Sequence, residues 1–522
     1  MSSPAKRSGS DLSPDDYTQL ISDLANYPTG DGETVNSLHH FLKIRFLHQR
    51  QDNFVTIYDL CPDAHHRHPT LRDIKTPLEL QNEPPLTSRQ NIRQLVFLKG
   101  FPSQQWIKAL GSKYQVDPVF FSRHLDFHDQ ENRSLGRFAT PVLPSSSWHI
   151  FQFSCMTIAT RDRVTQDVQD LRAKVDAGMI QYIRSLKSGQ SHEVGDSIVR
   201  PCHVVDNETF VLEQQITVCL HLLKSGWIVL IWSDAGKSLH EDRDVASVKP
   251  WRTGTHKFSE PLLHFAPIVS HRPMLALKPH LLVGSRRGFA NGKCPESIGL
   301  LDQHYGRSLR LALMANDPAY ALSEVFSLVA ASHNQFLNLM HEKLNMHEQN
   351  DSYAAFPVLR YLKQILSRHT LQLEEIAMAL ENTKNRKWPK SPDADARPHA
   401  EFMMETFHND LDYLLKRAKQ HHDRSHEAIN LLMNSTSIAD ARDQASETER
   451  IGKLTFVAFF YAPLSFATSL FGMNFKEVGE GLSIWIWFAV AVPLLGVTLL
   501  AYLLPTKVFL RNERRKAVNR SR

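Results

Sequence analysis

The sequence predicts an α+β membrane protein: a cytosolic domain built on an α/β sheet, then a long stalk helix and two C-terminal transmembrane helices. Three observations support this class. They are strand-like segments in the first half, helical patterns after residue 316, and two apolar segments of membrane length near the C-terminus. A chain of 522 residues is too long for one compact core, so more than one structural unit is expected.

Residues 1–80 are expected to form a partly helical N-terminal extension. The segment 14–27 has Pro14 in its first turn and acids directly after it, which is typical of a helix start. The leading residues lack the apolar core of a signal peptide, and their acids argue against a transit peptide. The chain is therefore expected to start in the cytosol.

Residues 81–315 are predicted to form the cytosolic α/β domain. The segments 91–100 and 149–160 are rich in β-branched and aromatic residues, as strands are. The segments 210–223 and 226–236 are interpreted as two strands joined by a turn at Lys224-Ser225-Gly226.

Residues 316–398 are predicted to be a helical hairpin region of the same domain. Asn316-Asp317-Pro318 is a helix start signal, and a second helix is expected near 353–383. The cluster of Pro and charged residues at 384–398 then indicates an exposed turn.

Residues 399–453 are predicted to form one long stalk helix that continues into the first apolar segment. Neither Pro nor Gly occurs from His399 until Gly452. A weak heptad with several polar members favours packing against partners on more than one side. Its members are Phe407, Leu411, Leu414, Ala418, His421, Ser425, Ala428, Leu432, Ser435 and Ala439.

Two apolar segments are predicted to span a membrane. Residues 454–473 are 20 positions without a formal charge and residues 482–504 are 23, lengths that a bilayer core requires of a helix. They are joined by an outer loop, 474–481, and followed by a basic tail, 505–522. Basic residues flank both segments on the side away from this loop, so both termini are expected in the cytosol.

One face of the first apolar segment is lined mainly by small side chains. The stripe follows helical steps of four, four, three and four: Leu454, Ala458, Ala462, Ser465 and Ser469. Such a stripe suits either close helix packing or a wet lumen, and taken alone it favours packing. A pore would need several copies of the helix around an axis.

The composition and the motifs exclude several classes of function. A net charge of +5 without a basic patch interleaved with aromatic residues argues against nucleic acid as a partner. Phosphate-loop, HExxH and GxSxG motifs are absent, so no enzyme is predicted and no cofactor is implied. The histidines His39, His40, His65, His66 and His68 are interpreted as solvated, and Cys61, Cys155, Cys202, Cys219 and Cys294 as reduced thiols.

The stretch "APLSFATSLFGMNF" at 462–475, together with the two spans, the short loop and the basic tail, resembles the CorA-type divalent cation transporters. The hallmark of that family is Gly-Met-Asn at the outer end of the first span, matched here by Gly472, Met473 and Asn474. Pro463 stands where the family has its mid-span proline.

The resemblance implies a funnel-shaped homopentamer in a membrane, most readily the plasma membrane, in which five first spans line the pore. The stripe from Leu454 to Ser469 would then face the lumen, and five Asn474 side chains would form a ring that binds the hydrated cation. Glu477 and Glu480 in the outer loop would attract cations, while Lys476 stands where the family often has an acid.

The ion implied by the resemblance is Mg²⁺, as the transported ion and as a possible regulator. Two alternatives stay open. One is a zinc, cobalt or nickel transporter of the same family. The other is a non-conducting sensor or interaction protein anchored in the membrane on the same scaffold.

Overall fold

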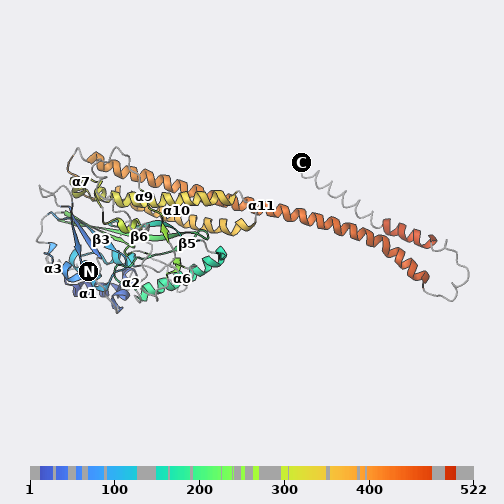
Figure 1. Cartoon of the computed structure of the whole chain (residues 1–522), viewed down its shortest axis with the longest axis horizontal. Helices are drawn as coiled ribbons and strands as arrows, with labels where there is room; N and C mark the ends of the chain where they lie inside the picture. Colours follow the sequence, from blue (N-terminus) through green and yellow to red (C-terminus); the bar gives the residue numbers. More distant parts are fainter. Residues whose placement is uncertain are drawn as a thin grey trace, which may run out of the picture. The chain divides into compact units, whose positions relative to one another are not determined.

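The computed structural model describes residues 12–26, 31–44, 54–60, 69–86, 91–125, 148–162, 165–188, 192–224, 226–237, 239, 249–252, 263–269, 296–303, 305–348, 353–384, 388–393, 397–472 and 488–500. The chain divides into two compact units, residues 1–427 and residues 428–522. Unit 1 holds a mixed sheet with helices on both of its faces, and Figure 1 shows the three layers.

The strands of unit 1 are short at the edges of the sheet and long in its centre. They are β1 (Val55–Asp59), β2 (Thr70–Ile74), β3 (Arg93–Lys99), β4 (Ile150–Thr160), β5 (Cys202–Val204), β6 (Thr209–Leu223), β7 (Gly226–Ser233) and β8 (His264–Phe265). Their order is β2-β1-β3-β7-β6-β4-β8, and β5 pairs with β6. Among these pairs β3 and β7 run parallel, and the others are antiparallel.

The helices are α1 (Pro14–Ala25), α2 (Asp31–Lys43), α3 (Pro77–Asn82), α4 (Gln104–Tyr114), α5 (Pro118–His124), α6 (Val168–Ser188), α7 (Leu311–Asn316), α8 (Pro318–Ala321), α9 (Ser323–Glu348), α10 (Phe356–Lys384) and α11 (Arg397–Gly472). One face of the sheet shares a core with α1, α2, α4, α5 and α6. On the other face, α9 and α10 pack against β4.

The central strands are buried on both faces, which explains their nearly continuous apolar sequences. Every residue from Trp227 to Ser233 of β7 is buried. The predicted turn before β7 is also present, since Leu223 pairs with Gly226 across the hairpin. Gly226 has φ of +147°, and an added Cβ would lie 2.0 Å from the carbonyl oxygen of Ile92, so this turn requires glycine. Ser225 lies outside the described residues.

Strand and helix positions largely agree with the sequence predictions. The four predicted strands correspond to β3, β4, β6 and β7, and the predicted second helix corresponds to α10. The start signal at Asp317 caps α8 through hydrogen bonds from the N–H groups of Ala319 and Tyr320, both 3.0 Å long. The long helix α9 begins only at Ser323, so this signal starts a separate short turn.

The boundary expected at residue 80 does not divide the structure. Strand β1 pairs with β3 in the middle of the sheet, and the side chains of Tyr17 and Ile21 in α1 belong to the same core as the sheet. The Tyr17 hydroxyl donates a 2.8 Å hydrogen bond to the carbonyl of Val116. Strands of five residues carry little periodicity, so the sequence alone does not reveal that β1 and β2 belong to the sheet. The expected limits at 315 and 398 also fall inside unit 1.

Helix α11 runs unbroken through the range predicted for the stalk helix and into the first apolar segment. The predicted seam is buried from Phe407 to Ser425 and fades beyond it. Ala428 is half-buried, Leu432 is buried, and Ser435 and Ala439 are exposed. From Ser435 onward almost every described residue of α11 is exposed, so the later members of the predicted seam are exposed together with the rest of the helix surface.

Gly111→Ala tests whether α1 is part of the core. A Cβ at this position would lie 2.0 Å from the Tyr17 ring. We expect a loss of about 2 kcal/mol in stability, because overpacking outweighs the better helix propensity of alanine. Thermal unfolding followed by near-UV circular dichroism measures the effect.

The control is Gly299→Ala, whose Cβ would meet its first neighbour at 3.8 Å and should leave the melting temperature nearly unchanged. An equal melting temperature for Gly111→Ala and the unmodified chain would show that α1 does not pack as described.

Candidate functional site

Residues 454–472 of the first apolar segment form the C-terminal part of α11, in unit 2. The stripe predicted from the sequence, Leu454, Ala458, Ala462, Ser465 and Ser469, therefore lies along one face of a helix, and all five residues are exposed in the single chain. Bulky aromatic residues on other faces are exposed as well, such as Phe459 at 49% and Phe466 at 62%. The single chain therefore leaves the small face and the aromatic face equally uncovered.

Pro463 lies inside α11 and is buried. Proline has no N–H group, so the carbonyl of Phe459, four residues earlier, lacks its usual helical partner. The helix continues to Gly472 in spite of this loss. Residues 488–500 of the second apolar segment are also helical, and Ala491 there is 2% exposed.

Several predicted site residues lie outside the described residues. Gly472 ends α11, whereas Met473, Asn474, Glu477 and Glu480 fall in the range 473–487 that is not described. The same holds for the ends of the second apolar segment and for the basic tail. Within the described ranges, no helix combines the length and the apolar character that crossing a membrane requires.

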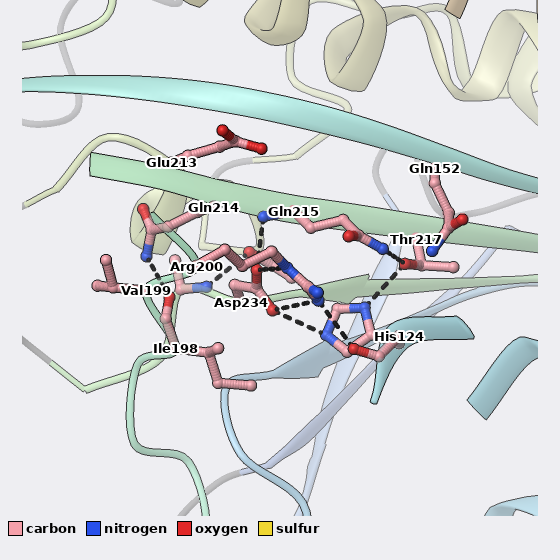
Figure 2. A network of polar contacts seen from close by, with 12 residues as sticks. His124, Gln152, Ile198, Val199, Arg200, Glu213, Gln214, Gln215, Thr217 and Asp234 are labelled. Carbon is pink, nitrogen blue, oxygen red and sulfur yellow. Dashed lines mark hydrogen bonds and ion pairs between the residues drawn. The ribbon is translucent and has the colours of Figure 1, made fainter. Parts of the chain in front are cut away.

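A second set of polar residues lies inside unit 1, around the carboxylate of Asp234 at the end of β7. Figure 2 shows Arg200, His124 and the backbone of Gln215 converging on it. The Nε and Nη2 atoms of Arg200 donate hydrogen bonds of 2.7 and 3.2 Å to the two carboxylate oxygens. The Nε2 atom of His124 lies 3.1 Å from Oδ1, and the Gln215 N–H donates to Oδ2 at 2.6 Å.

Asp234 stays ionised because its partners outweigh its burial. Burial alone would raise the pKa of this carboxyl, but the charge of Arg200 and the contact with His124 hold the pKa below its ordinary value. A buried carboxylate with a bidentate guanidinium partner and a backbone donor has most of its acceptor capacity filled. The Asp234 carboxylate thus holds three segments together: the loop before β5 through Arg200, the end of α5 through His124, and β6 through Gln215.

Thr217, His124 and Asp234 form a row of hydroxyl, imidazole and carboxylate, the order found in nucleophilic catalysis. The Nδ1 atom of His124 lies 2.8 Å from the Thr217 hydroxyl, and the ring stacks on Trp232 with 3.9 Å between centroids. All three residues of the row are 0% exposed. Burial lowers the pKa of His124 to about 4, although Asp234 opposes the shift. A base this weak, enclosed on all sides, is structural.

Glu213 on β6 connects the sheet to α10. Its Oε1 atom accepts a 2.6 Å hydrogen bond from Gln372 and lies 3.6 Å from the guanidinium of Arg368. Burial raises the pKa of Glu213, and Arg368 and Gln372 oppose the shift. Sequence reasoning missed this residue and Asp234. The available signal was the polar run Glu213-Gln214-Gln215 in the middle of an otherwise apolar strand.

His333 on α9 and His369 on α10 face each other beside this cluster, with 4.8 Å between ring centroids. Both rings are buried, and none of their nitrogens meets hydrogen-bond geometry. Burial lowers the pKa of His333 to about 4 and that of His369 well below its ordinary value. Both side chains are therefore neutral at pH 7 and pack as aromatic rings.

No metal site is apparent in the described ranges, since no three His, Cys, Asp or Glu side chains are placed to hold an ion together. His40 is exposed on α2, whereas His65, His66 and His68 lie outside the described residues. Cys155, Cys202 and Cys219 are buried free thiols.

One family model matches part of the chain. Residues 298–515 match the model of the CorA-like Mg²⁺ transporter protein family. No curated protein matches the chain. Among solved structures the chain is similar to the CorA magnesium transporter from Methanocaldococcus jannaschii, at 11% identity and a TM-score of 0.35, covering 87% of this chain and 98% of that one. The family match rests on residues 298–515.

Asp234→Asn should destabilise unit 1 by about 3–5 kcal/mol, because it leaves the charge of Arg200 buried without a counter-charge. Urea unfolding followed by tryptophan fluorescence measures the loss. Glu374→Gln is the matched control. It removes the partner of Lys419 at a half-exposed ion pair, and its cost should stay below about 1 kcal/mol. Equal costs for the two variants would contradict the assigned role of Asp234.

His333 should make unit 1 less stable in acid. Its pKa is lower in the folded chain, about 4, than the ordinary 6.5, so the unfolded chain takes up the proton first as the pH falls. The stability lost between pH 6.5 and pH 4 through this one group is at most roughly 3 kcal/mol.

His333→Gln removes that titration. The melting temperature of this variant, relative to the unmodified chain, should therefore rise as the pH is lowered from 6.5 to 4. The same substitution at the exposed His40 is the matched control. A difference independent of pH for His333→Gln would refute the neutral, buried state of this ring.

Proposed function

We propose that this chain is a membrane transporter for divalent cations, with Mg²⁺ as its leading ion, because residues 298–515 match the model of the CorA-like Mg²⁺ transporter protein family. The family match is the observation that carries this proposal. The matched range includes α9, α10, α11 and both apolar segments of the sequence. The family consists of transporters, which agrees with the enclosed, structural character of the Thr217–His124–Asp234 row.

In this proposal residues 454–473 and 482–504 are the two spans, and both termini lie in the cytosol. The support comes from the sequence: two uncharged segments of 20 and 23 residues, a loop of eight residues between them, and basic residues on their cytosolic flanks. The plasma membrane is the membrane proposed for this topology.

The pore requires more than one copy of the chain. A single α11 cannot enclose a lumen, and its apolar part is exposed on both its small and its aromatic faces. Five copies around an axis would place the stripe from Leu454 to Ser469 on the lumen and would cover the aromatic faces with lipid and with second spans. The proposed assembly is a homopentamer, the number of copies that the resemblance to the CorA-type transporters implies.

Asn474 is proposed to form the selective ring at the outer mouth. Mg²⁺ is a hard cation that gives up its water reluctantly, and neutral carboxamide oxygens can hydrogen-bond to its hydration shell without removing it. A membrane potential of 100 mV, negative inside, favours entry of a divalent ion by about 4.6 kcal/mol, so uptake needs no separate energy source.

The preference of the proposed transporter among divalent cations depends on the charge of the outer loop. Glu477 and Glu480 attract cations, and Lys476 offsets part of that attraction. The proposal therefore extends to zinc, cobalt and nickel as alternative cargo, and Mg²⁺ is proposed as both cargo and regulator.

Asn474→Ala should reduce divalent cation uptake at least tenfold, because the ring that binds the hydrated ion would lose its oxygens. The full chain is reconstituted in lipid vesicles with an inside-negative potential, and uptake of Mg²⁺, Zn²⁺, Co²⁺ and Ni²⁺ is compared by fluorescent indicators. The matched control is Asn430→Ala, an exposed asparagine of α11 away from the proposed mouth, which should transport like the unmodified chain.

Absence of any cation uptake by the unmodified chain, in vesicles that contain correctly inserted protein, would overturn the transport proposal. It would favour the non-conducting sensor on the same scaffold. Uptake of Zn²⁺, Co²⁺ or Ni²⁺ in preference to Mg²⁺ would keep the transporter and replace its ion.

A further inference from the structure

Two arginines of α11 hold the helix to α9 inside unit 1. Arg417 donates to the side-chain oxygens of Asn334 and Asn338, at 2.8 and 2.6 Å. Arg424 donates to the side-chain oxygen of Asn345 at 2.7 Å and pairs with Glu348, and its Nη1 atom lies 3.4 Å from His341 Nδ1. The three asparagines are neutral, so most of these contacts are charge-assisted hydrogen bonds that salt screens less than ion pairs.

The contacts repeat along the two helices with the same spacing. Arg417 and Arg424 are seven residues apart, and so are their acceptors, because Asn334 and Asn338 are followed by His341 and Asn345. Acceptor numbers rise with arginine numbers, so α9 and α11 run parallel here. Together the acceptors form one row, in steps of four, three, four and three residues, called the acceptor row below. It consists of Asn334, Asn338, His341, Asn345 and Glu348.

The acceptor row offers the arginines more than one position. If α11 moves by one helical turn, about 5.4 Å, toward the C-terminal end of α9, Arg417 meets Asn338 and His341. Arg424 then meets Asn345 and Glu348. Neither guanidinium loses all of its partners. A movement in the opposite direction would bring Arg417 to Ala331 and Asn334, and Arg424 to Asn338 and His341. Arg417 would then keep a single side-chain acceptor, whereas the first direction offers two acceptors to each arginine.

Other contacts of the same part of α11 favour the present position. Phe407 stacks on Phe326 of α9 with 4.7 Å between centroids, and the His421 ring lies 5.3 Å from the His341 ring. Lys419 pairs with Glu374 of α10 at 2.7 Å. The residue numbers of these facing pairs on α9 and α11 differ by 80 or 81, which defines the present register. A one-turn step changes that difference to about 77.

We propose that Arg417 and Arg424 set the axial register of α11 on α9, and that α11 steps by one turn along the acceptor row to regulate transport. The regulatory half of this statement rests on the proposed function. One-turn steps between packed helices are an established form of conformational switching. Helix α11 is continuous as far as Gly472. The helix whose register Arg417 and Arg424 set is therefore the same helix that carries the proposed pore stripe.

Disulfide trapping in the full chain tests the register. The present register is reported by His341→Cys with His421→Cys, and the stepped register by Leu344→Cys with His421→Cys. Cys61 and Cys294 are replaced by Ser. The three other cysteines are kept, because they are buried free thiols. With both arginines present, we expect the disulfide between positions 341 and 421 to form predominantly. The disulfide between positions 344 and 421 should form to a smaller but measurable extent.

Removing the arginines should shift this ratio. In Arg417→Gln/Arg424→Gln the trapping ratio of the stepped pair to the present pair should rise by about fivefold, the effect of one net hydrogen bond. Lys416→Gln, an exposed residue on the same helix, removes one charge and should leave the ratio unchanged. If the double glutamine variant does not fold, Arg417→Lys/Arg424→Lys keeps the charge, loses the forked geometry and should shift the ratio in the same direction.

Trapping only in the present register, with and without the arginines, would overturn both the step and the role of the arginines. Regulation is tested separately in vesicles. The disulfide between positions 341 and 421 should change cation uptake at least twofold, reversibly on reduction. Unchanged uptake with this bridge formed would overturn the regulatory half alone. A chain that carries no cation at all would instead contradict the proposed function and leave the trapping result standing.

Discussion

Asp234 is a charged group with no exposed surface, and the groups that bind it come from three other parts of the chain. Arg200 precedes β5, His124 ends α5, Gln215 belongs to β6, and Asp234 itself follows the last residue of β7. A carboxylate in such a place is tolerated only when all of these partners arrive together, because a buried charge without partners is costly. The position of the hairpin β6–β7, and with it the centre of the sheet, depends on this one interaction.

The same constraint extends to the helices on the other face. Glu213, two residues from Gln215, is bound by Gln372 and faces Arg368, so the polar run in β6 connects the Asp234 cluster to α10. Helix α10 and helix α9 meet at the neutral rings of His369 and His333. Helix α11 is then held to α9 by Arg417 and Arg424. A continuous series of contacts therefore runs from the middle of the sheet to the helix that carries the first apolar segment.

Helix α11 changes character along its length. From Phe407 to Ser425 it buries one stripe within unit 1, and from Ser435 onward its residues are almost all exposed in the single chain. A helix that leaves apolar side chains uncovered on every side needs another environment for them, which the proposed membrane and the neighbouring copies would supply. The exposure of the side chains therefore differs sharply between the two halves of α11, which is one continuous helix with residues in both units.

The sequence by itself determined the strong local patterns. The long apolar strands β3, β6 and β7, the helices α10 and α11, and the Gly-Met-Asn motif after the apolar segment all follow from periodicity, from breakers, or from a motif with a fixed position. Only the tertiary structure decided that β1 and α1 belong to the core. Pairing with β3 and packing of Tyr17 on Gly111 are contacts between residues far apart in the chain, and local periodicity does not record them. The same holds for Asp234, Glu213 and the acceptor row on α9: each polar residue looks ordinary in sequence, and its role arises from the partners that folding brings to it.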